Sequence, residues 1–454
     1  MDLFRTRPTQ STPSDLKPCL TALDLILLGI GAIVGAGIFV LTGVAAATQA
    51  GPAIVISFLF SGIACTFAAL SYAELASSIG GAGSAYSYGY ASLGELIAWI
   101  IGWDLLLEYG VGVCAVAIGW SGYFNNAMAA IGLHIPDYLL KTPGEGGVLN
   151  LPAMMIIWIL SFVIALGVEQ SARFNALIVT VKLIAIAIFV IVAIPNVNSE
   201  NWHPFLPFGW TGVFGGAALV FFAYIGFDAV STAAEETIKP QRNLSIGIIG
   251  SLLICSFIYI VVSGLLTSIT SYKTLNVKSP VAETILHLGH PIAAGIIAVG
   301  AIAGITSVML IFIYGLTRVF FAISRDGLLP AYFSKVNAKT KTPLRIIFLA
   351  TIIMSLGAGL FSIQTVAELV NIGTLAAFII VCLGVVVLRH TKPDMPRPFK
   401  TPFSPVFPLL GALSCAYLMI HLPLLTWLRF IIWMMIGLVI YFSYGYRHSK
   451  LHKQ

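Results

Sequence analysis

The stretch Gly29-Ile-Gly-Ala-Ile-Val-Gly-Ala-Gly-Ile-Phe39 lies in the middle of the first long apolar run, which extends from about residue 21 to residue 47. A run of this length can cross a bilayer core roughly 30 Å thick. Each glycine inside a helix costs about 1 kcal/mol relative to alanine, and the stretch contains Gly29, Gly31, Gly35 and Gly37. In a membrane, unwound backbone is tolerated only where it is buried in protein or lines a cavity. The stretch therefore predicts a membrane helix that is interrupted near its centre.

A second stretch, Gly215-Gly-Ala-Ala-Leu-Val-Phe-Phe-Ala-Tyr-Ile-Gly-Phe-Asp228, repeats this pattern five segments later, with Gly226 close to a carboxylate. Two interrupted helices at corresponding places in two halves indicate the binding site of a transporter. The spacing of Gly31 and Gly35 also suits close helix packing, and that alternative stays open. A nucleotide-binding loop is rejected, because the spacing is G-x-G-x-x-x-G and no strand precedes it.

The composition is that of a membrane protein. The 454 residues are 58% hydrophobic and 9% charged, with a mean hydropathy of +0.97, whereas soluble domains carry about 25% charged residues. The six cysteines are scattered without metal-ligand spacing, and the first residues have no cleavable signal pattern. The net charge of +6 is spread over alternate loops rather than gathered in one patch, so nothing indicates a nucleic-acid partner.

The apolar segments predict an all-α membrane protein with twelve transmembrane helices. They lie near residues 21–47, 52–77, 92–124, 151–169, 173–195, 211–237, 245–270, 291–324, 344–362, 365–389, 403–422 and 424–446. If both termini are cytoplasmic, 19 of the 24 lysines and arginines fall on the inner side, and the outer loops hold only Lys141, Lys273 and Lys278. That bias favours a multi-pass protein of the cell membrane with both termini inside.

The positions of the two interruptions predict an internal repeat. Segments one to five and six to ten, at about 21–195 and 211–390, would form two inverted halves of a core spanning residues 21–390. Residues 391–446 would then hold two accessory helices. Residues 1–20 and 447–454 would be cytoplasmic ends.

Lys182 lies about two turns inside the fifth segment. A lysine within a membrane segment faces the protein interior by default. Burial disfavours its charged form, so Lys182 could load and release a proton. The alternative is that its long side chain reaches the cytoplasmic headgroups.

Acidic side chains occupy two other segments. Asp228 follows the second interruption, where it could bind a cation, relay a proton or cap free backbone amides. Glu108 lies in the third segment, four residues after Asp104 on the same helix face. Pairing of Glu108 with Lys182 or with a neighbouring helix stays open.

The two interruptions suit an amino acid as ligand. The amino ends of half-helices present free N–H groups to a carboxylate, and freed carbonyls can accept hydrogen bonds from an ammonium group. Four aromatic residues crowd the second interruption, namely Phe221, Phe222, Tyr224 and Phe227. One of them could cover the substrate, and at least two are expected to be ordinary packing residues.

Together these stretches resemble the amino acid–polyamine–organocation superfamily, and within it the cationic amino acid transporter family. The resemblance covers nearly the whole chain. It is carried by Gly29–Phe39, Ser71-Tyr-Ala-Glu-Leu, Gly81-Ala-Gly-Ser-Ala-Tyr, Trp103–Tyr109, Phe222–Ser231, Tyr314–Pro330 and Arg397-Pro-Phe-Lys-Thr-Pro. It implies a LeuT-type fold, in which a five-plus-five inverted repeat has discontinuous helices 1 and 6.

The resemblance also implies substrate contacts. The substrate carboxylate would bind at Ala36 and Gly37, and its ammonium would bind carbonyls of Ile33, Phe222 and Ile225, with Ala223 in the same stretch. Phe222 matches the aromatic residue that closes over the substrate. Some relatives have a hydroxyl at the position of Ala36, so backbone amides would carry more of the carboxylate binding here.

The implied coupling ion is a proton. Lys182 matches a lysine that, in proton-coupled relatives, takes the place of a sodium ion near the backbone of Gly31. Thr306 and Ser307 fall where sodium-dependent relatives supply hydroxyls. Asp228 and Glu108 complete the candidates for proton coupling. Sodium is not expected, and no metal or other cofactor is implied.

The expected function is import of an L-amino acid, cationic or small and neutral, with protons by alternating access to a site at mid-membrane depth. An exchanger of amino acids or polyamines on the same scaffold is the nearest alternative. A membrane-embedded enzyme would need a nucleophile–base pair or a metal cluster, and a channel would need a filter motif; the sequence suggests none of these. Apart from substrate and lipid bilayer no partner is indicated, and a monomer is compatible with the sequence.

Overall fold

The structure, a computed structural model, describes residues 20–79, 84–130, 132–166, 171–277, 279–337, 339–340 and 342–450. Within these ranges the regular structure is helical, apart from one isolated bridge between Leu20 and Thr237. The predicted all-α class is therefore confirmed. Residues 1–19, most of the predicted cytoplasmic start, lie outside the described residues.

The first predicted segment is interrupted where the glycines are. It consists of α1 (Ala22–Ile33), a π-helical turn η1 (Gly37–Leu41), α2 (Thr42–Ala45) and a second π-helical turn η2 (Ala46–Ala50). Thr21 and Asp24 cap the start of α1 reciprocally. Between α1 and η1 the chain leaves the helix at Val34, which has an extended conformation. The chain then turns at Gly51 and continues through η3 (Gly51–Ala53) into α3 (Ile54–Ser78).

The sixth segment is also divided. It contains α8 (Gly209–Val220) and two 3-10 stretches, η8 (Phe221–Tyr224) and η9 (Phe227–Glu236). The remaining segments are single helices: α5 (Glu95–Ala130), α6 (Leu151–Leu166), α7 (Ser171–Ala193), α9 (Pro240–Ile269), α11 (Pro291–Arg325), α12 (Leu344–Leu360), α13 (Ile363–Thr391), α14 (Val406–Ile420) and α15 (Leu424–Ile440). Each of the twelve predicted segments thus coincides with a helical segment.

Length and composition support membrane crossing. Eight described segments are long and apolar enough to cross a bilayer, and four shorter apolar helices accompany them. One of the eight, Gly37–Ser78, has 42 residues, about twice what a single crossing needs. The turn at Gly51 divides it into two crossings.

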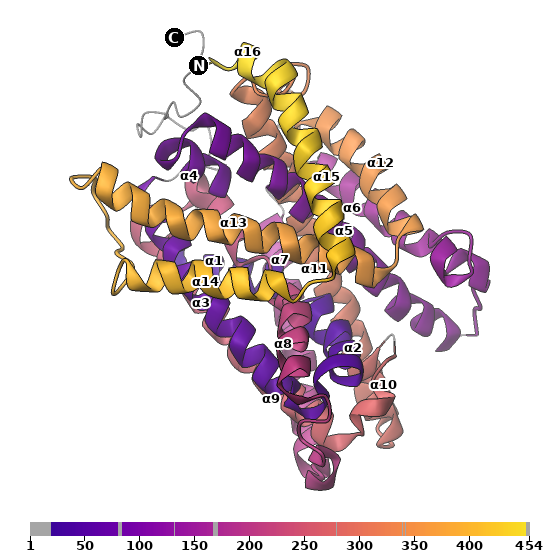
Figure 1. Cartoon of the computed structure of the whole chain (residues 1–454). Coiled ribbons are helices and arrows are strands. Elements are labelled where there is room, and N and C mark those ends of the chain that lie inside the picture. Colours follow the sequence, from indigo (N-terminus) through magenta and orange to yellow (C-terminus); the bar gives the residue numbers. More distant parts are fainter. Residues whose placement is uncertain are drawn as a thin grey trace.

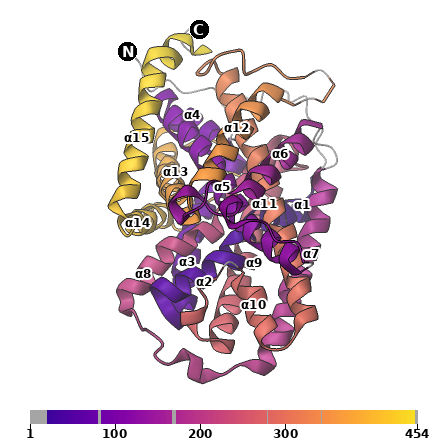
Figure 2. The ribbon, with the colours of Figure 1, turned by 90° about the vertical axis from the view of Figure 1, so that its right-hand side faces the viewer.

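Two helices outside the predicted segments extend the fold at its ends. The short helices α4 (Ala85–Ser92) and α10 (Pro280–His287) lie at opposite ends of the molecule (Figure 2). After α15 the chain continues helically through η11 (Tyr441–Gly445) and α16 (Tyr446–His448). Both α4 and α10 are only eight residues long, too short to give a periodic pattern in the sequence.

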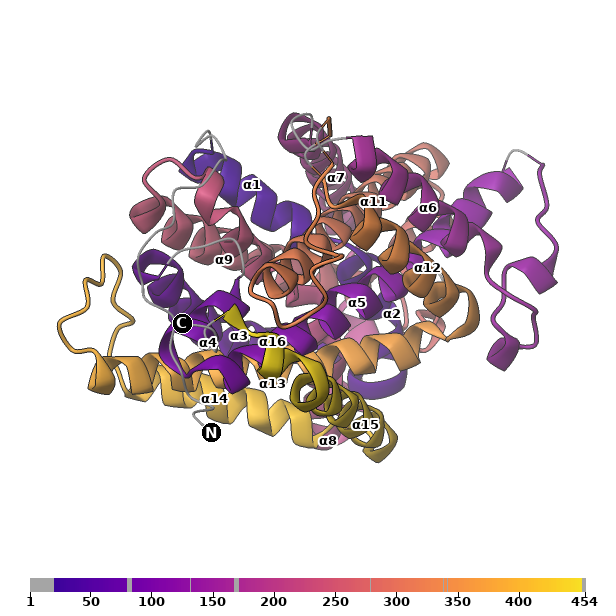
Figure 3. The same cartoon turned by 90° about the horizontal axis from the view of Figure 1, so that it is seen from above.

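The helices differ in how deeply they are buried. Of an 18-residue apolar stretch in the sixth segment, 83% is buried, whereas only 17% of such a stretch in α15 and its extension is buried. Viewed from above, α13, α14 and α15 lie along one edge, and α6 and α12 lie toward another side (Figure 3). Figure 1 shows α13 and α14 side by side, and α14 packs against α3. In the first segment, residues 29–43 around the interruption are all buried, so both interruptions lie inside the protein, as a binding site between them requires.

The proposed division into two inverted halves, 21–195 and 211–390, stays a prediction. The helix count and the positions of the two interruptions are those that the division requires.

Candidate functional site

The two interruptions lie against each other. A Cβ atom added to Gly37 would overlap the backbone of Ala223, and one added to Gly226 would lie 2.8 Å from the carbonyl oxygen of Ala32. Gly226 also has a φ angle of +116°, which strongly favours glycine. Two of the predicted glycines are therefore required by this close approach of backbone to backbone.

A small cavity lies at this crossing. Its lining is contributed by the first interruption, the second interruption, α5 and α11: Ala32, Ile33, Gly35, Ala36, Gly37, Val116, Phe222, Ile225, Val308 and Phe312. Its volume of about 10 Å³ is close to that of one water molecule. In this conformation the cavity is too small to hold an amino acid.

Five of the six predicted substrate residues line this cavity. They are Ile33, Ala36, Gly37, Phe222 and Ile225. The sixth, Ala223, packs instead against Gly37, just behind the lining. At the start of η1 the first N–H groups have no partner inside the helix, so they could bind a carboxylate.

Lys182 reaches the first interruption and not the headgroups. Its side chain is fully buried. Its Nζ donates to the carbonyls of Gly31 at 2.9 Å and Val34 at 2.8 Å, and it lies 3.2 Å from the hydroxyl of Ser307. The ammonium thus satisfies carbonyls on both sides of the point where helix 1 unwinds. The alternative in which Lys182 extends to the membrane surface is wrong.

The two candidate hydroxyls on α11 have different neighbours. Ser307 contacts Lys182, and its hydroxyl also lies 3.1 Å from the Gly31 carbonyl. Thr306 instead donates to the carbonyl of Ile302 and accepts a hydrogen bond from Trp120. Of the two, only Ser307 belongs to the Lys182 site.

Tyr259 on α9 is a functional candidate that the sequence did not reveal. Its hydroxyl lies 2.9 Å from the Ile33 carbonyl and 2.8 Å from the Ala223 carbonyl. The hydroxyl has one proton, so it donates to one of these oxygens at a time. Tyr259 therefore links the two interruptions directly, through carbonyls of which one, that of Ile33, was predicted to bind the substrate ammonium.

Other side chains satisfy carbonyls farther from the cavity. Asn371 on α13 donates from Nδ2 to the carbonyl of Ala218 at 2.9 Å, near the end of α8. The hydroxyl of Tyr123 on α5 donates to the carbonyl of Phe39 at 2.8 Å. Backbone carbonyls at and around the interruptions are thus bonded from several surrounding helices, as buried polar groups require.

The acidic residues form a separate buried group beside the cavity. Asp228 accepts a hydrogen bond from the hydroxyl of Tyr109 at 2.6 Å. No carboxylate among the described residues lies within ion-pair distance of Lys182, so the suggested pairing with Glu108 is not formed. Neither oxygen of Glu108 or of Asp104, nor the second oxygen of Asp228, has a hydrogen-bond partner in the described part of the chain. Such groups could carry protons rather than fixed charges.

Only one of the four aromatic residues at the second interruption faces the cavity. Phe222 belongs to the lining. Phe221 and Phe227 pack against Phe378 of α13, and the Tyr224 hydroxyl donates to the carbonyl of Phe58. Phe222 is therefore the aromatic residue that could cover a substrate, and the other three are packing residues.

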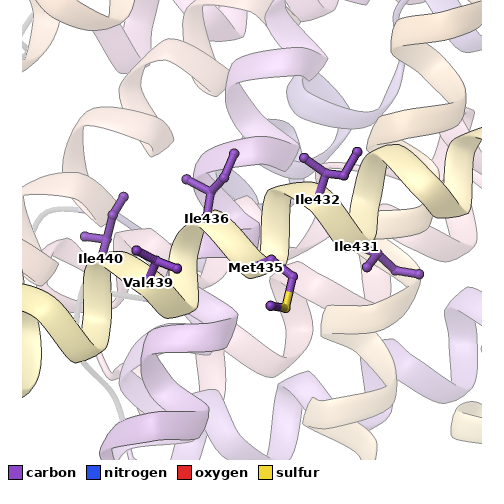
Figure 4. A pocket seen from close by; sticks show the side chains of 6 residues that line it. All are labelled: Ile431, Ile432, Met435, Ile436, Val439 and Ile440. Carbon is purple, nitrogen blue, oxygen red and sulfur yellow. The ribbon is translucent and has the colours of Figure 1, made fainter.

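A second, wider hollow lies on the outer surface of α15. It is lined by Ile431, Ile432, Met435, Ile436, Val439 and Ile440, all carried by one helix (Figure 4). Its lining contains no polar or charged side chain. This surface is suited to lipid chains and lacks the polar groups that would orient a substrate.

Comparison with known proteins identifies the family. A family model described as amino acid permease matches residues 20–443. The chain is 49% identical to the methylthioribose transporter of Bacillus subtilis (strain 168), over 99% of both chains. It is 48% identical to the branched-chain amino acid permease BcaP of the same organism, over 98% of this chain and 96% of that one.

A more distant relative belongs to the resembled family. The chain is 35% identical to the vacuolar cationic amino acid transporter 4 of Arabidopsis thaliana, over 84% of this chain and 65% of that protein. The match of the permease model supports a multi-pass membrane transporter rather than an enzyme. The chain therefore belongs to the amino acid permease family, within the amino acid–polyamine–organocation superfamily.

Proposed function

We propose that this protein imports neutral amino acids with small apolar side chains, together with protons, into the cell across the cytoplasmic membrane. The observation that carries the proposal is the buried ammonium of Lys182 bonded to the Gly31 and Val34 carbonyls, beside a cavity between two interrupted helices. In the proposed mechanism this ammonium would take the place of a coupling cation at the unwound backbone. Sodium is then not needed, and both termini are cytoplasmic by the distribution of lysine and arginine.

The lining favours a neutral substrate over a cationic one. Val116, Val308 and Phe312 supply apolar surface opposite the interruptions, and neither Glu108 nor Asp228 belongs to the lining. A cationic side chain would meet the nearby ammonium of Lys182 without an acidic partner, which is unfavourable in a water-poor interior. The side-chain part of the site is thus suited to groups such as the methyl of alanine or the isopropyl of valine.

Binding would use backbone groups at one end and apolar groups at the other. N–H groups at Ala36 and Gly37 would hold the substrate carboxylate, and carbonyls at Phe222 and Ile225 would accept from its ammonium. Phe222 would cover the bound molecule. Glu108 and Asp228, next to the site and without cationic partners, would pass protons between Lys182 and the cytoplasmic side.

The relatives support this substrate class. One of them is named for branched-chain amino acids and another for methylthioribose, and both kinds of molecule carry a small apolar end group. Methylthioribose itself is the second candidate substrate, because the relative named for it is 49% identical over 99% of both chains.

Uptake into proteoliposomes tests the proposal. With an acidic exterior and no sodium, the wild type should accumulate valine or leucine above equilibrium, and arginine should not compete. Lys182→Ala should lose accumulation while it keeps exchange of internal for external substrate. Lys141→Ala, which removes an exposed lysine of an outer loop, serves as the matched control.

Three results would contradict the proposal. They are sodium-dependent accumulation, accumulation by Lys182→Ala equal to that of the control, and exchange by the wild type with no net uptake. The last would identify an exchanger. A thermal-shift panel of the twenty amino acids and methylthioribose would show which substrate binds, because a ligand stabilises the folded state according to its affinity.

A further inference from the structure

Helix α13 contacts both sides of the second interruption, which lies within residues 215–228 and is called the helix-6 interruption below. Asn371, fully buried, donates from Nδ2 to the carbonyl of Ala218, and Nδ2 lies 3.4 Å from the carbonyl of Leu219. Two turns farther along α13, Phe378 packs against Phe221 at a ring distance of 5.9 Å and against Phe227 at 5.0 Å. Residues seven apart lie on the same face of a helix, so one face of α13 spans the gap from α8 to η9.

The bond from Asn371 reaches a place where the helix itself leaves carbonyls without partners. Ala218 lies in the last turn of α8, where main-chain carbonyls lose the donor four residues on. Beyond Val220 the chain continues as a 3-10 turn. The amide of Asn371 is the one side-chain donor to the Ala218 carbonyl among the described residues, so it ties the end of this half-helix to α13.

Packing alone does not explain an asparagine at this position. Its Oδ1 is buried and has no hydrogen-bond partner among the described residues, which is destabilising. Leucine has a similar shape and would fill the same space without an unpaired oxygen. The useful part of Asn371 is therefore its amide donor.

We propose that α13 stabilises the helix-6 interruption. Asn371 is the positioning residue, and its hydrogen bond holds the end of α8 in place relative to the cavity. Asn371 does not touch the cavity. It acts through α8 on Phe222 and Ile225, which do. The proposal rests on the transport function proposed above, because its effect on the site is measured as substrate affinity.

A neighbouring serine provides the control. Ser61 on α3 is equally buried, and its hydroxyl donates to the carbonyl of Ala217 at 2.7 Å. That carbonyl also accepts from the N–H of Phe221, so it stays bonded when the serine hydroxyl is removed. Asn371→Leu and Ser61→Ala thus each delete one interhelical bond to adjacent residues of α8, but only the first leaves a helix-end carbonyl without its side-chain donor.

The test combines hydrogen exchange with transport, using full-length protein in nanodiscs and in proteoliposomes. In Asn371→Leu, backbone amides between residues 218 and 226 should exchange about tenfold faster than in the wild type, and the apparent KM for valine should rise about tenfold. The maximal rate should change less than about twofold, because the translocating helices are intact. Ser61→Ala should leave both the exchange of this segment and KM within about twofold of wild type.

Equal hydrogen-exchange rates of residues 218–226 in Asn371→Leu and Ser61→Ala would contradict the stabilising role of α13. So would an unchanged KM in Asn371→Leu. If the leucine variant does not fold, Asn371→Ala replaces it with the same expectations. If the wild type shows the expected protection from hydrogen exchange but transports no amino acid, the proposed transport function is wrong. If the wild type transports and the Asn371 substitution changes neither hydrogen exchange nor KM, only the proposed role of α13 is wrong.

Discussion

The two interrupted helices are held by different chemistry. At the helix-1 interruption, carbonyls of Gly31 and Val34 accept from the ammonium of Lys182. At the helix-6 interruption, the carbonyl of Ala218 accepts from the neutral amide of Asn371. Tyr259 contributes a hydroxyl to both, at Ile33 and Ala223.

An ammonium can release a proton, whereas an amide cannot. Under the proton coupling proposed above, the bonding of the helix-1 interruption would change with proton occupancy, whereas the amide of Asn371 would keep its bond to Ala218. Helix 1 would then be the helix that responds to the proposed coupling proton. Phe222 and Ile225 of helix 6 line the cavity, and Tyr259 connects the two interruptions.

The largest effect on transport should come from a substitution that adds a side chain at the contact between the two interruptions. Gly37→Ala places a methyl group against the backbone of Ala223, which cannot move aside as a side chain can. We expect no measurable uptake from this variant. Gly110 is a half-buried glycine of α5 with open space around its Cβ position, so Gly110→Ala should transport like wild type. Normal uptake by Gly37→Ala would show that the helices do not meet at this point.

Removing the shared hydroxyl should weaken both interruptions together. Tyr259→Phe leaves the carbonyls of Ile33 and Ala223 without this donor, and an unpaired buried carbonyl costs about 1–3 kcal/mol. The apparent affinity for valine should fall about tenfold. Tyr224→Phe, which loses an equally buried bond to the Phe58 carbonyl, is the control in the same uptake assay. Equal affinities of the two variants would argue against the link.

A smaller effect on transport is expected when Lys182 keeps its hydrogen bonds to the Gly31 and Val34 carbonyls but loses the one to the Ser307 hydroxyl. Ser307→Ala should lower proton-driven accumulation about two- to threefold, because Gly31 and Val34 still accept from the ammonium. Thr306→Ala should leave accumulation unchanged, since Thr306 bonds to Ile302 and Trp120. Accumulation that falls further in Thr306→Ala than in Ser307→Ala would reverse this assignment.

The sequence could predict the interruptions and Lys182 because each is anomalous in a membrane segment. Clustered glycines weaken a helix, and a lysine in hydrocarbon needs a partner. These two features were predicted from the residues themselves, whereas the contact of Lys182 with Gly31, which the structure shows, was implied by the family resemblance. The aromatic residue facing the cavity, Phe222, came from the family resemblance and not from its own pattern.

Tyr259, Asn371 and the apolar lining could not be found in this way. A tyrosine or an asparagine in a long apolar helix is common at interfaces and in packing. Val116, Val308 and Phe312 look like any other membrane residues. Their roles depend on which helices pack together and on how each is rotated, and the sequence of one chain does not contain a direct signal for either.

The most direct test of a substrate site between the two interruptions is the position of bound valine in an experimental density map of the protein. We predict density between the two interruptions, with the carboxylate at the N–H groups of Ala36 and Gly37 and the isopropyl group against Val116 and Val308. Density for valine elsewhere, with an unbroken backbone contact between Gly37 and Ala223 in the same map, would contradict it.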